Sequence, residues 1–260
     1  MAEALRKRRW AERLTRAALL LSVGGVVAAL LAALGSGREL WSFGTGFLVL
    51  RFAFFAAIAA VLFALVAMML ARRGQSELLP RNLAALLVAL LFILYIGYQV
   101  STARSVPAIH DVATDLDDWP KFYRLKVRDD NLANIPDMGR ADLARLPARE
   151  RWKAIHREHY GDLRTVAVPW SVAETVSRAE ALARARGWEI ATADPRIGIV
   201  EAVDTSTFFR FKDNVVVRAR PAPTGKGSLV DMRSISRVGG SDIGVNAKRV
   251  RAFLKDLQQA

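Results

Sequence analysis

The chain has 260 residues, a formal net charge of +13, 52% hydrophobic residues and no cysteine. The absence of cysteine excludes disulfide frameworks, thiolate metal sites and cysteine nucleophiles. Nearly all long uncharged stretches lie before residue 101, so the composition predicts a part in lipid followed by a part in water.

Three apolar segments in the first hundred residues are each long enough to cross a bilayer, which takes about 20 residues. Buried helices of a soluble core are the other interpretation, and three successive segments without a polar face disfavour it. The first segment could instead be a cleaved signal peptide, although its apolar run is long for one. We predict a membrane domain over residues 1–103, with transmembrane helices at about 17–36, 44–70 and 83–101.

Basic residues flank these segments unevenly. The leader RKRRWAERLTR is basic, and so is the second loop, through Arg72, Arg73 and Arg81. The first loop holds only Arg38 beside Glu39. Because Lys and Arg are retained in the cytoplasm, we predict a cytoplasmic N-terminus and an extracytoplasmic domain over residues 104–260. The expected location is a bacterial inner membrane, with the C-terminal domain in the periplasm.

The composition of residues 104–260 predicts an α+β domain. Its first forty or so residues show no period and predict an extended strap over the surface. Helices are predicted from Pro147 to Gly161, from a capping box at Ser171 to Gly187, and over about 245–258. Short alternating runs with tight turns lie between the last two helices. They predict an antiparallel meander of about four to five strands, because such links permit hairpins but no crossovers.

Three blocks of this region resemble a known family. They are PAIHDVATDLDDWPKF, GWEIATADPRIGIVEAVDTSTFFRFKDNVVVRARP and VDMRSISRVGGSDIGVNAKRVRAFL. In order and spacing they resemble the bacterial and plastid family called domain of unknown function 1499, over roughly residues 106–257. The stretch GTGFLVLR also resembles the hydrophobic leader of bacterial members. The resemblance implies the extent of the domain and its attachment to a membrane segment, but it implies no reaction.

The stretch SRVGGSDIGVNAKR, residues 236–249, connects the last predicted strand to the last predicted helix. Glycine-rich turns before a helix present backbone N–H groups that can bind a phosphate or carboxylate group. The candidate anion site comprises Arg233, Arg237, Gly239, Gly240 and Ser241. A purely structural corner is the alternative, because Asp242 would repel an anion, and Ser241, Asp242 or Asn246 could each cap the helix.

A second polar stretch, DVATDLDD, follows His110. Its aspartates Asp115, Asp117 and Asp118 could bind a metal, or they could form Asx-type turns, since the stretch lacks the glycine and the distal glutamate of an EF-hand. His156 and His159 lack zinc spacing and are interpreted as solvated. GGSDIG departs from the esterase nucleophile elbow at one position. We therefore predict no catalytic residue and no cofactor.

These observations favour a membrane protein whose external domain binds an anionic ligand or a partner protein of the cell envelope. The lipid bilayer is the first expected partner, and nucleic acid is disfavoured because part of the basic excess flanks the membrane. An envelope hydrolase using His110 and the nearby carboxylates is one alternative. An accessory subunit of a membrane complex is another, with a small-residue stripe formed by Gly24, Gly25, Ala28 and Ala32.

Overall fold

The structure is a computed structural model that describes residues 2–71 and 75–259. It divides into two compact units. The first unit comprises Met1–Ser101 with Thr207–Arg210, and the second comprises Thr102–Ser206 with Phe211–Ala260.

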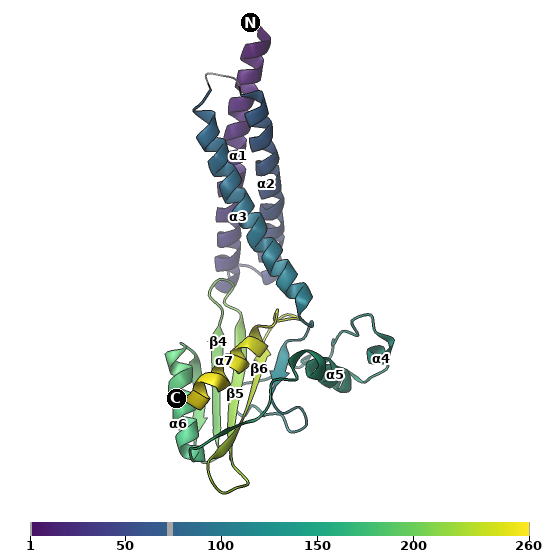
Figure 1. Ribbon diagram of the computed structural model, residues 1–260, viewed down its shortest axis with the longest axis vertical. Coiled ribbons are helices and arrows are strands. Elements are labelled where there is room, and N and C mark those ends of the chain that lie inside the picture. Colours follow the sequence, from purple (N-terminus) through teal and green to yellow (C-terminus); the bar gives the residue numbers. More distant parts are fainter. Residues whose placement is uncertain (1, 72–74, 260) are drawn as a thin grey trace. The chain divides into compact units, whose positions relative to one another are not determined.

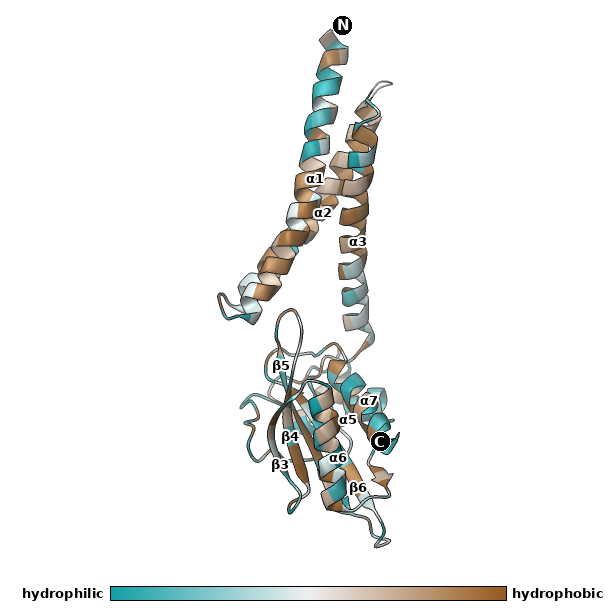
Figure 2. Cartoon of the chain, turned by 90° about the vertical axis from the view of Figure 1, so that its left-hand side faces the viewer, coloured by the Kyte–Doolittle hydropathy of each residue, from teal (hydrophilic) through white to brown (hydrophobic). Residues whose placement is uncertain are grey.

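Three long helices build the first unit: α1 (Ala2–Gly37), α2 (Phe43–Leu70) and α3 (Leu78–Ser105) (Figure 1). Each is long and apolar enough to cross a membrane, as predicted. α1 and α3 extend beyond the apolar segments of the sequence, because hydropathy marks the part of a helix suited to lipid and not its ends. Figure 2 shows this for α1, whose first turns are mostly hydrophilic.

Small side chains hold the three helices together. One buried cluster, Ala18, Ala64 and Ala85, takes a residue from each helix, and a second, Ala57, Ala60 and Ala89, joins α2 to α3. Alanine and glycine at such contacts let helix backbones approach closely. Gly25 lies in the α1–α2 contact, since a Cβ atom there would stand 3.3 Å from the carbonyl oxygen of Ala53. A Cβ atom added at Gly24 would meet no other atom within 4 Å, so only part of the small-residue stripe lies in a helix–helix contact of the bundle.

A six-stranded antiparallel sheet forms the centre of the second unit, and this confirms the α+β class. Its order is β1-β6-β5-β4-β3, and β2 pairs with another part of β6. The strands are β1 (Asp111–Ala113), β2 (Val166–Val168), β3 (Glu189–Asp194), β4 (Ile199–Thr205), β5 (Lys212–Pro221) and β6 (Ser228–Ser236). Strands β3 to β6 are the predicted meander. The short strands β1 and β2 were not predicted, because three residues cannot show an alternating pattern.

Four helices accompany the sheet: α4 (Ala141–Ala144), α5 (Ala148–Tyr160), α6 (Val172–Ala185) and α7 (Val245–Gln259). The predicted ends of α5 are confirmed, with Pro147 before its first residue and Gly161 after its last. Ser171 caps α6 by accepting the N–H of Glu174 at 3.3 Å. Gly187 follows α6 with a φ of +76°, a conformation that glycine adopts without strain.

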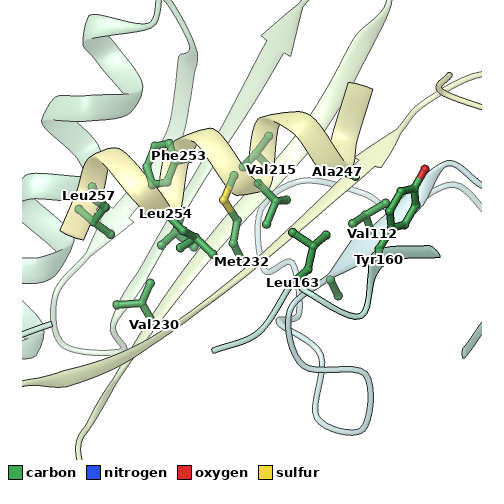
Figure 3. Close-up of a cluster of buried hydrophobic side chains, with 14 of the residues drawn as sticks. Val112, Tyr160, Leu163, Val215, Val230, Met232, Ala247, Phe253, Leu254 and Leu257 are labelled. Carbon is green, nitrogen blue, oxygen red and sulfur yellow. The ribbon is translucent and has the colours of Figure 1, made fainter. Parts of the chain in front are cut away.

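α6 and α7 cover the apolar face of the sheet. Figure 3 shows Phe253, Leu254 and Leu257 of α7 in one cluster with Val230 and Met232 of β6. Trp188 adds to this core by stacking on Phe253, with ring centroids 5.1 Å apart. Burying each such side chain contributes about 1.5–3 kcal/mol, so this layer fixes the sheet against the helices.

The opposite face of the sheet carries buried charged and polar side chains as well as apolar ones such as Val216 and Ile235, and the strap predicted from the sequence crosses it. Residues 114–140 contain turns and bends but neither helix nor strand. Glu201 of β4 is fully buried, and its carboxylate accepts the backbone N–H groups of Tyr123, Arg124 and Leu125. The side-chain amide of Asn214 in β5 donates to the carbonyl of Lys126 at 2.9 Å. Buried polar groups of the sheet therefore hold the strap in place.

Candidate functional site

The turn between β6 and α7 is exposed and carries a row of unused hydrogen-bond donors. Residues 237–240 are exposed, and Gly239 has a φ of +87°. Within residues 2–71 and 75–259, no acceptor receives the backbone N–H groups of Val238, Gly239, Gly240 or Ser241. Such a run of free N–H groups is a surface that can bind an anion.

The carbonyl groups of the same turn are held by the protein. Arg128 donates from Nη1 to the Gly239 carbonyl at 2.6 Å. The Nδ1 atom of His110 lies 3.4 Å from the Gly240 carbonyl oxygen. These contacts fix the turn from its carbonyl side, so its free donors need little ordering before they bind a ligand.

Arg237 supplies positive charge at this turn. Its Nε donates to Oδ1 of Asn214 at 2.7 Å, and Asn214 is itself fixed by the strap. No acceptor binds the two terminal nitrogens of Arg237 in the described part of the chain. Lys212 lies on the neighbouring strand, where its carbonyl accepts the N–H of Arg237 at 3.0 Å. The guanidinium group is thus held in position through Nε, and its two terminal nitrogens are available to a ligand.

Asp242 stabilises the connection between the turn and α7. Its carboxylate accepts the N–H groups of Gly244 at 2.9 Å and of Asn246 at 2.7 Å, and so caps α7. Burial raises the pKa of Asp242 above its ordinary value, while these two hydrogen bonds act in the opposite direction. The N-terminus of α7 is therefore occupied by the chain's own carboxylate, and the free donors belong to the turn before it.

Arg233 lies on the same strand but has other partners. Its Nε and Nη2 bind the two carboxylate oxygens of Asp111 at 3.0 and 2.7 Å, and both side chains are buried. The guanidinium also lies 4.0 Å from the ring centroid of Trp119. Asn131 donates to the same carboxylate at 2.6 Å. Arg233 is thus committed to an ion pair beneath the strap, and of the two predicted arginines only Arg237 is free at the turn.

A second buried carboxylate, Asp231, gathers two arginines that the sequence analysis did not single out. It accepts Nη2 of Arg218 at 3.0 Å and Nη2 of Arg220 at 2.6 Å. Burial alone would raise the pKa of Asp231, but hydrogen bonds from Thr165, Arg218 and Arg220 lower it below the ordinary value. Arg218 and Arg220 are two positions apart on β5, so their side chains lie on the same face of the strand. This spacing was the signal that the sequence offered, and in the structure Arg218 pairs in register with Asp231.

The three candidate metal ligands are engaged with basic side chains and with backbone N–H groups of their own turn. The Oδ1 atom of Asp115 accepts the N–H groups of Asp117 and Asp118 at 3.1 and 2.9 Å, which is the Asx-type turn considered from the sequence. Asp117 binds Lys153 at 2.7 Å, and Asp118 binds Arg218 at 2.9 Å. Among residues 2–71 and 75–259, no group of three or more potential protein ligands could hold a metal ion.

The interpretation of His156 as solvated is wrong. The side chain is buried on α5, and its Nε2 accepts the N–H of Ala113 at 3.2 Å. Burial lowers the pKa of His156 from 6.5 to about 4. His159 is exposed, as expected. The helical spacing from the buried Trp152 to His156 was the missed signal, because residues four apart lie on one face of a helix.

Comparison with known proteins supports the resemblance seen in the sequence. A search of curated proteins finds no match. A family model described as "Protein of unknown function (DUF1499)" matches residues 111–257, which is more than half of the 260-residue chain. The matched part extends from β1 to α7 and contains the turn, Asp111 and Asp231. The chain therefore belongs to the DUF1499 family.

Proposed function

We propose that this protein is a membrane-anchored binding protein whose domain, residues 104–260, lies outside the cytoplasm and binds a ligand with a phosphate or carboxylate group. The binding site is the turn with Arg237, Gly239, Gly240 and Ser241. The observation that carries the proposal is the run of unused backbone N–H groups beside a guanidinium whose orientation is fixed.

The chemistry of the turn suits an oxyanion. Backbone N–H groups donate to a phosphate or carboxylate without the entropic cost of ordering long side chains. The two terminal nitrogens of Arg237 add charge-assisted hydrogen bonds in a planar fork. Lys212 adds a second positive charge at the same end of the sheet. Arg233, paired with Asp111, supports the strap beneath the site and does not contact the ligand in this proposal.

The proposed topology rests on the positive charges at one end of the helices. The basic leader forms the start of α1, and Arg81 lies in the first turn of α3. Arg72 and Arg73 lie outside the described residues and contribute through the sequence alone. With a cytoplasmic N-terminus and three spans, the proposed topology has the first loop and the C-terminal domain on the same, outer side of the membrane.

The hydrolase alternative has less support. His110 lies at the turn, whereas Asp117 and Asp118 pair with Lys153 and Arg218. No hydrogen bond joins His110 to any of the three candidate aspartates in the described chain. General acid–base catalysis needs such groups within reach of one substrate, so binding without a reaction is the better-supported function.

The proposal is tested by binding of inorganic phosphate and acetate to the full-length protein in nonionic detergent, measured by calorimetry. We expect Arg237→Ala to weaken binding about tenfold or more, because a charge-assisted hydrogen bond contributes about 1.5–3 kcal/mol. Arg145→Ala is the matched control, since Arg145 is exposed next to α4. Equal affinities for the wild type and Arg237→Ala, or no binding of either anion, would refute the site.

A further inference from the structure

A second candidate binding site lies in the helical unit. A cavity of about 400 Å³ opens between α1 and α3. Four charged residues line it, Glu12, Arg16, Glu77 and Arg81, together with Thr15 and two leucines. Its volume is within the range of small-molecule sites, roughly 300–1,000 Å³.

The sequence places this cavity at the level of lipid headgroups. The apolar segment of α1 begins directly after Arg16, and that of α3 begins shortly after Arg81. A polar pair marks the same level, because Nδ2 of Asn82 donates to the hydroxyl of Thr15 at 3.0 Å. Asn82 is fully buried, and its Oδ1 has no partner in the described part of the chain. The charged lining thus stands where hydrocarbon gives way to water.

The charges of the lining do not neutralise one another. Glu12 with Arg16, and Glu77 with Arg81, have the i, i+4 spacing that favours an ion pair along a helix. Glu12 instead binds Arg8 at 3.0 Å. Arg16, Glu77 and Arg81 form no ion pair with any residue in 2–71 or 75–259. Two cations and two carboxylates therefore border one cavity, and three of these four groups are available to a ligand.

We propose that the cavity binds the headgroup of a zwitterionic phospholipid with a primary ammonium group, the chemistry of phosphatidylethanolamine. Arg16 and Arg81 bind the phosphate, for which guanidinium groups have matching geometry. Glu77 accepts hydrogen bonds from the ammonium, which has three donors, and Glu12 accepts another through Oε2, the oxygen that Arg8 does not bind. A quaternary ammonium has no such donors, and an anionic headgroup without an ammonium group, such as that of phosphatidylglycerol, leaves both carboxylates unmatched. The cavity is independent of the turn near Arg237, and either site can exist without the other.

Native mass spectrometry of the full-length protein in mild detergent tests this site. The protein is equilibrated with equal amounts of phosphatidylethanolamine, phosphatidylcholine and phosphatidylglycerol that have identical acyl chains. We expect phosphatidylethanolamine to be retained about tenfold over phosphatidylcholine, as one extra charge-assisted hydrogen bond would give. Glu77→Gln should bring this ratio close to one, and Arg81→Ala should reduce retention of all three lipids.

Two substitutions at the other end of the bundle control for general effects of charge. Arg38→Ala and Glu39→Gln change the same residue types in the first loop and should keep the wild-type lipid ratios. Glu12→Gln serves as the second carboxylate variant if Glu77→Gln does not fold. Equal retention of the ethanolamine and choline lipids by the wild type would overturn the proposal. A wild-type ratio in every folded carboxylate variant would overturn it as well.

Discussion

His156 shows how burial changes the protonation of a single side chain. Its ring contacts Trp152 and Tyr160, at centroid distances of 5.4 and 5.6 Å, and its Nε2 accepts the N–H of Ala113. Burial lowers the pKa of His156 from 6.5 to about 4, so the unfolded chain binds this proton more readily than the folded chain. The stabilisation is complete above the unfolded pKa and is lost as the pH falls from 6.5 towards 4.

We expect this histidine to lower the free energy of unfolding by roughly 2 kcal/mol between about pH 7.5 and pH 5. Most carboxyl groups, with an ordinary pKa near 3.8, titrate below that range, and Asp242, whose pKa is raised by burial, changes stability in the opposite direction. Chemical unfolding of the full-length protein at several pH values measures the slope. His156→Gln should flatten it, whereas His159→Gln should preserve it. An unchanged slope in His156→Gln would show that the imidazole is not buried in the neutral form.

Some residues of the candidate site could be predicted from local sequence and others could not. The turn at Gly239 and the Asx-type turn at Asp115 depend on neighbours two or three residues away, so their residue types are informative. The partners of Arg233 and Glu201 could not be predicted in this way, because they are distant in the sequence. Asp111 lies 122 positions from Arg233, and Leu125 lies 76 positions from Glu201. Only the paired sheet brings such residues together, and one sequence does not reveal that pairing.

The strap over residues 114–140 is held in place by a side chain of the sheet. It has no regular secondary structure, so its backbone N–H groups need acceptors elsewhere. Glu201 provides them for three consecutive residues, with distances of 3.1 Å to Arg124 and 2.8 Å to Leu125. The Glu201 carboxylate is thus an anion bound by a nest of three backbone N–H groups. One side chain of β4 thereby fixes the middle of the strap.

Glu201→Gln tests this role. The amide keeps the size of the side chain but replaces one acceptor oxygen with a donor, which would face backbone N–H groups. We expect a loss of about 2–4 kcal/mol of unfolding free energy, together with faster amide hydrogen exchange at residues 121–126. Glu189→Gln, on the exposed surface of β3, is the control and should change stability by less than about 0.5 kcal/mol. Wild-type exchange rates in Glu201→Gln would contradict the anchoring role.

The regular elements were easier to predict than the short ones. α6 has a capping residue, a helical apolar pattern and a glycine after its end, and all three signals agree. Strands β3 to β6 are six to ten residues long, so each forms a strand-like run that turn residues bound in the sequence. By contrast, β1 and β2 have three residues each and depend on pairing with β6. Their position is determined by tertiary contacts, which local propensity does not describe.

At the scale of the whole molecule, the chain joins three helices suited to a bilayer to a domain of the DUF1499 family. The two parts differ in how they are stabilised. Alanine contacts hold the helices, whereas the domain has an apolar core on one face of its sheet and buried ion pairs on the other. In the proposed arrangement the helices fix the domain at one side of the membrane, where the turn with Arg237 meets its ligand.

The central claim, an extracytoplasmic domain behind three spans, is tested by labelling single cysteines in intact cells with a membrane-impermeant maleimide. Because the chain has no cysteine, each variant carries one reactive thiol. Arg38→Cys probes the first loop, Ser76→Cys the second and Thr224→Cys the exposed turn between β5 and β6. We predict labelling of Arg38→Cys and Thr224→Cys in intact cells, and of Ser76→Cys only after lysis. Labelling of Ser76→Cys alone in intact cells would contradict this topology.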